Sequence, residues 1–305
     1  MTILMTGLCE KGADQIWKQC NDAMYAQGVT WLEEAAYAGD AEAWFFLGHC
    51  YSWGDGAVGF NEKKAYECYL RGASAGSARA VLGALRAGQY DEQMKRSARY
   101  SIEESYRQVR DAAEMGDVYA AWQMGEAVEW EDLADYMPQT ESAREQCLFW
   151  YERAADGGII PAMVKMGKCC QNGTYREKDE KEALRWANQC AASGEVWGLF
   201  QMGEHYRQEE DWEAAFQYDY AAAKQGSSRA MLYLGQMYLN GQGTERDIQA
   251  AVQALEGAAA RNEAESFEEL GNLFYQDELV ERDDEKAFYW YGKAYAAGIK
   301  EAALP

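Results

Sequence analysis

The chain has 305 residues, a formal net charge of −22, and a composition that is 48% hydrophobic and 13% aromatic. That much apolar surface excludes a disordered acidic tail, because the chain can bury a core. The negative charge argues against binding to nucleic acid or to an anionic membrane, and no apolar run approaches the ~20 residues that insertion into a bilayer requires.

The amino end, MTILMTGLCEKG, has no basic lead and only a short apolar run, which argues against a secretory signal. We therefore expect a cytoplasmic protein whose eight cysteines are reduced thiols. The cysteines contain no C-x-x-C pair and only two histidines accompany them, so a structural zinc site is not expected.

A repeat becomes visible along the chain when it is aligned on one glycine. We call this glycine the anchor of its repeat. A small side chain stands four residues after each anchor, and in most repeats an Ala-Ala pair stands four and three residues before it. The anchors are Gly39, Gly76, Gly116, Gly158, Gly194, Gly226, Asn262 and Gly298. Their spacing of 32 to 42 residues, by subtraction, is typical of a solenoid. Because glycine can take the left-handed conformation that closes a helix, each anchor is predicted to end one.

Each repeat is predicted to contain two helices. The first begins after the anchor and carries, in six repeats, a second glycine nine residues on. Glycine inside a helix costs ~1 kcal/mol against alanine, so its return indicates close helix packing. The second helices are predicted at 63–75, 102–115, 144–157, 180–193, 212–225, 247–261 and 284–297.

This pattern predicts an all-α chain that forms a single repeat domain over residues 1–305. Residues 1–38 would form amino-terminal cap helices, residues 39–298 about seven helix pairs, and residues 299–305 a truncated last helix.

The best-conforming repeat lies at residues 230–259 and begins AMLYLGQMYLNGQG. Its pattern A-x-x-x-L-G-x-x-Y-x-x-G-x-G, followed by D-x-x-x-A and by Ala-Ala, resembles the Sel-like repeat, a relative of the tetratricopeptide repeat. The resemblance extends from about residue 28 to the end. It departs between Gly76 and Gly116, where Leu85 replaces the second glycine, and at 126–145, where the connection is longer. It implies a right-handed α/α superhelix that serves as an adaptor or binding surface, and it implies no catalytic mechanism.

One face of the first helices is the candidate contact surface. Positions 3, 7, 10 and 14 after each anchor lie opposite the small residues that face the core, and in related repeats the first helices line the concave surface. The candidate partner-binding residues there are Phe46, His49, Trp53, Arg86, Tyr90, Tyr119, Trp130, Lys165, Trp197, Gln201 and Tyr233. Large aromatic side chains among polar ones are typical of protein interfaces. The alternative is that Trp53, Trp130 and Trp197 simply pack between neighbouring helices.

The acidic residues are unevenly distributed. From Glu263 to Glu285 there are ten acidic residues and one basic residue, and a second cluster falls within 129–135. Such a field attracts a basic protein or peptide and speeds its association. Solubility alone would account for the same charge.

Motifs for catalysis or cofactor binding are missing. The segment G-Q-G-T at 241–244 lacks the lysine of a phosphate loop, and His205 has no set of partner residues. Cys50 and Cys169 share one repeat position, with Cys68 and Cys190 on the helices that follow. Some secreted relatives form disulfides between paired helices, but without a signal sequence we expect free thiols here.

Three functions remain open. The first is a scaffold that binds one protein partner, expected to be basic, on its concave surface; a narrower version is an immunity protein that neutralises a bacterial toxin. The second is a general adaptor in a multiprotein complex, with oligomers formed through the carboxyl end. The third is an enzyme, which would need a convergent polar pocket that the sequence does not reveal.

Overall fold

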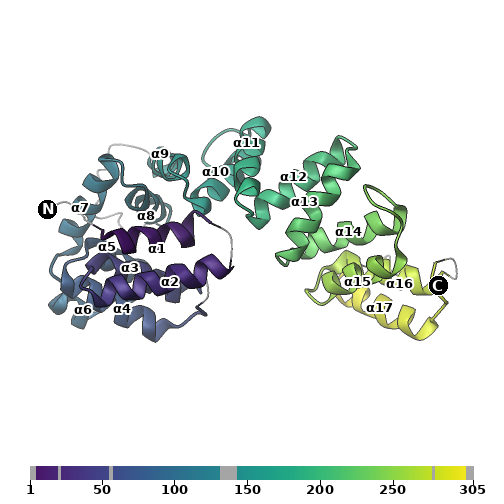
Figure 1. Ribbon diagram of the computed structural model, residues 1–305, viewed down its shortest axis with the longest axis horizontal. Helices are drawn as coiled ribbons and strands as arrows, with labels where there is room; N and C mark the ends of the chain where they lie inside the picture. The colour runs from purple at the N-terminus through teal and green to yellow at the C-terminus, as the bar shows by residue number, and fades with distance from the viewer. Residues whose placement is uncertain (1–4, 20–21, 55–57, 131–142, 277–278, 300–305) are drawn as a thin grey trace. The chain divides into compact units, whose positions relative to one another are not determined.

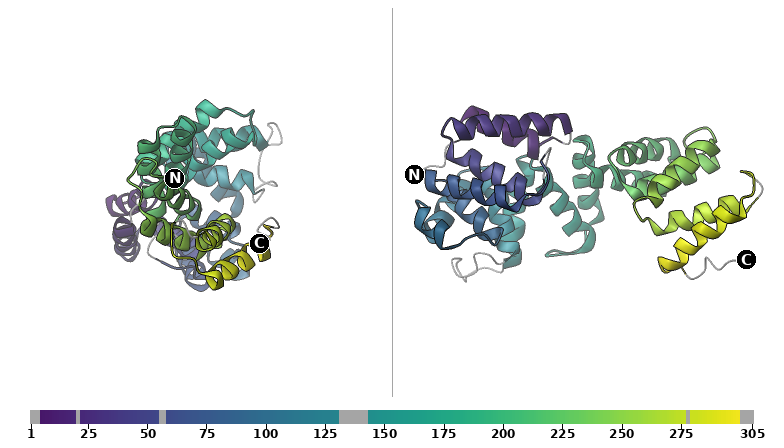
Figure 2. Two further views of the ribbon diagram at one scale, coloured as in Figure 1. Left: turned by 90° about the vertical axis from the view of Figure 1, so that its right-hand side faces the viewer. Right: turned by 90° about the horizontal axis from the view of Figure 1, so that it is seen from below.

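The computed structural model describes residues 5–19, 22–54, 58–130, 143–276 and 279–299, and the secondary structure in these ranges is α-helical (Figure 1 and Figure 2). The helices are α1 Gly7–Trp17, α2 Asp22–Tyr37, α3 Ala41–Trp53, α4 Glu62–Ala75, α5 Ala78–Arg86, α6 Glu92–Ser97, α7 Ile102–Glu114, α8 Val118–Glu129, α9 Ala143–Asp156, α10 Ile160–Asn172, α11 Glu180–Ala192, α12 Val196–Gln208, α13 Trp212–Lys224, α14 Ser228–Asn240, α15 Ile248–Ala259, α16 Ala264–Tyr275 and α17 Asp284–Ala296. The predicted all-α fold of paired helices is confirmed.

The chain forms two compact units, residues 1–189 and 190–305, and the division falls inside α11. Unit 1 has a core that is rich in alanine and aromatic side chains. Unit 2 contains α12 to α17, and its core gathers around Leu232, Leu255, Phe267 and Tyr291. Since the repeat frame continues through the division, one domain over the whole chain stays a prediction.

The anchor residues end helices as predicted. All eight have a positive φ, from 61° at Asn262 to 104° at Gly76. In several repeats a capping side chain then begins the next helix. The carboxylate of Asp40 accepts hydrogen bonds from two backbone N–H groups of α3, and the hydroxyl of Ser77 accepts one from the backbone N–H of Ala80 in α5. The seven second helices lie within two residues of their predicted ranges.

The second glycine of the repeat lies where two helices pack closely, as predicted. A Cβ atom on Gly48 would lie 2.6 Å from the ring of Tyr69, and one on Gly235 would lie 2.6 Å from Leu255. The same contact recurs between Gly125 and Tyr151, between Gly203 and Asp219, and between Gly271 and Tyr291. Each of these partners belongs to the second helix of its own repeat. Glycine is therefore required there by the neighbouring side chain.

Replacing Gly235 by alanine is expected to lower the free energy of unfolding by about 1–3 kcal/mol, because Leu255 must move to admit the methyl group. Gly292 is the matched control, since its Cβ would meet nothing within 4 Å. There alanine is expected to stabilise α17 by about 0.5–1 kcal/mol. Urea denaturation of both variants measures the difference, and equal effects would contradict the packing role.

The amino-terminal segment is more than a cap. Helices α1 and α2 form a pair that continues the repeat frame, because Gly12 stands 36 residues before Gly48, by subtraction. A Cβ on Gly12 would lie 2.8 Å from Leu32 of α2, which is the contact that marks the other repeats. The short helix α6 is a further element that the sequence did not predict. The truncated last helix falls at residues 299–305, and all but Ile299 lie outside the described residues.

Within the ranges given above, each helix is too short or too polar to span a membrane.

Candidate protein-binding site

The first four repeats begin with helices α1, α3, α5 and α8, and a cluster of aromatic side chains lies among these helices. Trp17, from α1, lies 5.1 Å from the Phe46 ring of α3 and 5.7 Å from the Trp122 ring of α8, measured between ring centroids. It also contacts the rings of His49 and Tyr119, at 5.6 and 6.3 Å. The first helices of this part of unit 1 therefore curl around one aromatic cluster, with Trp17 at its centre.

Polar contacts hold α1 in this position. The Tyr119 hydroxyl donates a hydrogen bond of 2.5 Å to Asp14 of α1, and the backbone N–H of Thr6 donates one of 2.6 Å to Asp40. Arg79 of α5 is fully buried beneath the start of α1, where it pairs with Asp117 and lies 3.5 Å from Glu42. The first two contacts join α1 and its cap residue to α8 and to the start of α3, and Arg79 links the starts of α3, α5 and α8 to one another.

The closed cluster corrects part of the predicted contact surface. Phe46 and Tyr119 were expected to face a partner, but they are 0% and 4% exposed. His49 is also largely buried, at 7%. The physical reason is that α1 covers the middle of the first helices, so only side chains near their carboxyl ends reach the surface.

Three of the predicted residues do meet at those carboxyl ends. Trp53 ends α3 and is 49% exposed, while Trp130 caps α8 and is 58% exposed. The guanidinium of Arg86, at the end of α5, lies 5.1 Å from the Trp53 ring and 4.5 Å from the Trp130 ring. We call Trp53, Arg86 and Trp130 the Trp–Arg–Trp patch. Both distances lie within the range of a cation–π attraction, which favours this arrangement of the three side chains.

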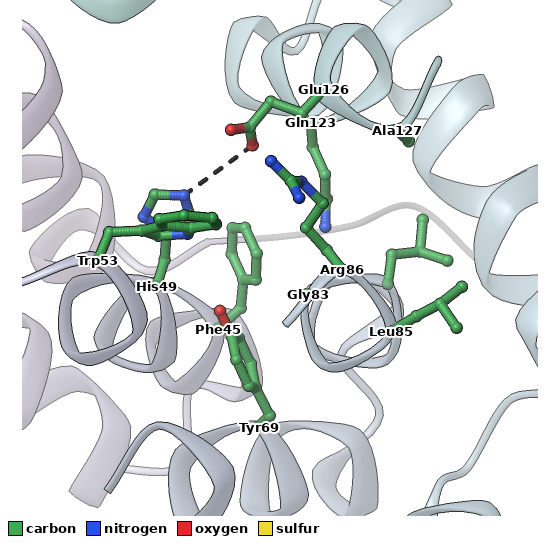
Figure 3. Close-up of a pocket in the computed structure, with 11 residues that line it drawn as sticks. Phe45, His49, Trp53, Tyr69, Gly83, Leu85, Arg86, Gln123, Glu126 and Ala127 are labelled. Carbon is green, nitrogen blue, oxygen red and sulfur yellow. Dashed lines mark ion pairs between the residues drawn. The ribbon is translucent and has the colours of Figure 1, made fainter. Parts of the chain in front are cut away.

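Trp53 and Arg86 of the patch also line a pocket (Figure 3). Its apolar lining includes Phe45, Tyr69 and Leu82. Glu126 approaches from the opposite side, with its carboxylate 3.9 Å from Nε2 of His49, and Figure 3 shows the guanidinium of Arg86 pointing toward the same space. Such a surface offers aromatic faces and charges for contact with a partner.

The remaining predicted residues lie elsewhere. Lys165 pairs with Glu129, whose other oxygen accepts the Tyr151 hydroxyl at 2.8 Å, and Tyr90 is half-buried after α5. In unit 2, Trp197 and Gln201 lie half-buried on α12, and Tyr233 lies half-buried on α14.

The sequence reading missed Trp17, Trp122 and Arg207. The first could have been found from spacing, because Trp17 stands 36 residues before Trp53, by subtraction. The guanidinium of Arg207 lies 3.7 Å from the centre of the Tyr233 ring. This contact joins two helices, so the periodicity of one helix cannot predict it.

In the part of the chain that the structure describes, the side chains form no metal site and no disulfide. No three His, Cys, Asp or Glu side chains are placed there to hold an ion. The seven cysteines in these ranges are buried and form no disulfide with one another.

The fold and the site define an α/α repeat protein built from stacked helix pairs, with a surface suited to contact another protein. The chain belongs to the Sel1 repeat proteins: the Sel1 repeat matches residues 23–40, 41–77, 118–159, 160–195, 228–262 and 268–299. Sel1 repeats mediate protein binding, and proteins built from them are generally non-catalytic scaffolds. Two helix pairs fall outside the match, at 78–117 and 196–227.

Known proteins share the fold at low sequence identity. An uncharacterised protein of Neisseria meningitidis serogroup B is 26% identical over 195 residues, which are 63% of this chain but 38% of that protein. A Sel1 repeat protein from Oxalobacter formigenes is 21% identical, with a TM-score of 0.55 over 97% of this chain and 83% of that one. A protective antigen of uropathogenic Escherichia coli, also 21% identical, has a TM-score of 0.50 over 92% and 68%. An immunity protein from Pseudomonas aeruginosa is 14% identical, with a TM-score of 0.32 over 99% of this chain and 85% of that one.

Proposed function

We propose that the protein is a non-catalytic scaffold that binds a protein partner at the Trp–Arg–Trp patch. One observation carries the proposal: two large indoles from separate repeats stay exposed, and both lie within cation–π distance of one arginine. Tryptophan and arginine are the residues that most often dominate the energy of a protein interface. Each further aromatic residue of the predicted contact surface in the first four repeats is at least half-buried, so Trp53 and Trp130 are the predicted aromatic contacts that stay exposed in this part of unit 1.

The stacking favours affinity through preorganisation. A free arginine or tryptophan on a surface loses side-chain entropy when a partner immobilises it, about 0.5–1.5 kcal/mol for each rotamer-rich side chain. Here Arg86 already lies against both rings, so much of that loss occurs on folding. The patch therefore suits a partner that packs against the outer faces of the two indoles.

The charge of the chain indicates the kind of partner. A net charge of −22 accelerates the association of a basic protein and repels nucleic acid. Such steering weakens with salt, because the Debye length falls from about 10 Å at 0.1 M to about 3 Å at 1 M ionic strength. The proposed partner is therefore a basic protein, met in the cytoplasm.

Capture from a lysate of the native cell tests the proposal. The bait would be the wild type, Trp53→Ala/Trp130→Ala, or Phe149→Ala, a control that removes another exposed ring of unit 1. We expect the double variant to lose the partner, by at least about tenfold in Kd when purified, because two hot-spot residues are removed. The control should bind like wild type. Loss with both variants, or with neither, would move the interface elsewhere; circular dichroism verifies that all three proteins fold.

Two narrower functions are separable by the identity of the captured protein. A toxin as the single partner, with its activity blocked in the complex, would make this an immunity protein; the supporting observation is the acidic charge that suits a basic toxin. A set of partners, or a stable oligomer, would make it a general adaptor. The adaptor is favoured by α17, where Phe288, Tyr289 and Tyr295 are more than half exposed.

A further inference from the structure

We infer that unit 2 carries a second binding site, a groove that takes an extended segment of a partner protein through a lysine or arginine side chain. The inference rests on the proposed function only in that the chain binds protein. It concerns different helices and different side chains from the Trp–Arg–Trp patch, and it can be tested without that patch.

The groove is built by three repeats of unit 2 and offers about 820 Å³ of open space. Arg207 of α12 and Tyr233 of α14 form one part of its lining, and Trp212, at the start of α13, forms another. Gln236 and Glu269 line it from α14 and α16. Most of its residues thus come from three first helices, α12, α14 and α16, which follow one another along the chain, so the groove can contact successive residues of a bound segment.

A buried ion pair fixes the wall of the groove. Arg207 pairs with Asp219 of α13, whose side chain is 0% exposed, and stacks on the ring of Tyr233 at 3.7 Å. Asp219 stands seven residues before its anchor Gly226, by subtraction, where other repeats place Tyr69, Tyr151, Leu255 and Tyr291. A buried ion pair usually stabilises a fold no better than the apolar residues it replaces. The presence of Asp219 in place of an apolar side chain is therefore better explained by its effect on the groove, because the ion pair holds Arg207 and Tyr233 in one arrangement.

The pairing also sets the charge of the groove. Since Asp219 neutralises Arg207, the carboxylate of Glu269 supplies the net charge of the lining residues. Gln236 orients that carboxylate by donating a hydrogen bond of 2.9 Å to its Oε1. The surroundings reinforce it: residues 190–305 contain 21 acidic and 9 basic side chains, a net charge of −12. A lysine or arginine is the complementary side chain.

The amide side chains indicate that the occupant is extended. Gln236, Asn240 and Gln242 all line the groove, and each amide can both donate and accept hydrogen bonds. An extended chain presents unpaired backbone N–H and C=O groups, whereas a helix has already paired its own. Amides along the groove therefore match an extended backbone, and Trp212 offers a ring for a neighbouring side chain of the ligand.

The probe for the test is a random dodecapeptide library displayed on phage and selected on the immobilised full chain. We expect the enriched peptides to share a lysine or arginine and to compete with one another. An enriched peptide, labelled with fluorescein, is then titrated by fluorescence anisotropy. Recovery of no binding peptide, or of peptides without a shared basic residue, would overturn the inference.

Variants then locate the site. Glu269→Gln is expected to raise the Kd of the enriched peptide by at least about tenfold, since it removes the charge opposite the ligand cation. Glu265→Gln, an exposed carboxylate on the same helix, is the matched control and should change the Kd less than about twofold. Asn240→Ala, an exposed change that spares the core, should weaken binding as well. Equal Kd values for Glu269→Gln and Glu265→Gln would place the peptide elsewhere. Trp53→Ala/Trp130→Ala should bind the peptide like wild type, which separates this result from that of the proposed function.

Discussion

Replacing Trp17 by alanine is expected to lower the free energy of unfolding by about 3–5 kcal/mol, which is the usual cost of emptying a buried aromatic site. Trp17 is 2% exposed and lies among Phe46, His49, Tyr119 and Trp122. Its ring meets side chains of both α3 and α8, so a small local shift of one helix cannot fill the space that it leaves. This loss of unfolding free energy would measure how much the packing of α1 against α3 and α8 contributes to stability.

Urea denaturation followed by circular dichroism gives this free energy. Trp53→Ala is the matched control, because it removes an indole that is 49% exposed and should cost less than about 1 kcal/mol. A small loss for Trp17→Ala, similar to that of the control, would mean that α1 is not part of the core and that the concave side of unit 1 is open to a partner.

Replacing Arg79 by methionine is expected to lower the free energy of unfolding by about 3–5 kcal/mol as well, for an electrostatic reason. Arg79 is fully buried, pairs with Asp117 and lies 3.5 Å from Glu42. Methionine fills most of the same space but leaves the two carboxylates without their cation. An uncompensated buried charge is more costly than a cavity of modest size.

The loss should depend on pH in a defined direction. Burial raises the pKa of Glu42 from 4.5 to about 7, and Arg79 acts against this rise. Without Arg79 the folded-state pKa of Glu42 rises further above that of the unfolded chain. A raised folded-state pKa contributes stability at low pH that is lost as the pH rises through it. The loss of unfolding free energy caused by Arg79→Met should therefore grow as the pH increases above about 7. In that range wild-type Glu42 is ionised, whereas the variant must either bury the unpaired Glu42 carboxylate or keep it protonated.

Urea titrations at pH 6 and pH 9 measure that growth. Arg107→Met is a suitable control, since Arg107 forms an exposed pair with Glu103 on α7 and should contribute less than about 1 kcal/mol. A loss for Arg79→Met that stays constant from pH 6 to pH 9 would show that Glu42 does not respond to Arg79.

The repeat architecture was predictable because its signals are local. A left-handed glycine must end each helix, and a second glycine must face the partner helix, whatever the rest of the chain does. Gly39 and Gly48 therefore could be assigned from spacing alone, and the second-helix boundaries came within two residues. The column that contains Trp53, Arg86 and Trp130 was predictable for the same reason, because it depends on the geometry of one helix and on a constant repeat.

The curvature of the array could not be predicted in this way. Whether position 3 or 7 of a first helix faces solvent or a neighbour depends on how tightly successive repeats turn, which is a sum of small rotations. Phe46 and Tyr119 were misplaced because the turn is tight enough to bring α1 against α8. Asp219 was missed for a different reason: its significance appears only when the second helices are aligned as carefully as the first.

The burial of the thiols has a consequence for how this protein responds to oxidants. Burial raises the pKa of Cys68 and Cys147 to about 12, and it raises that of Cys9 and Cys169 in the same direction. Oxidants and alkylating agents react with the thiolate, which these side chains almost never form while folded. Their rate of modification is then set by how often each repeat opens. The modification rates of the cysteines in α1, α4, α9 and α10 therefore report local unfolding at separate points along unit 1.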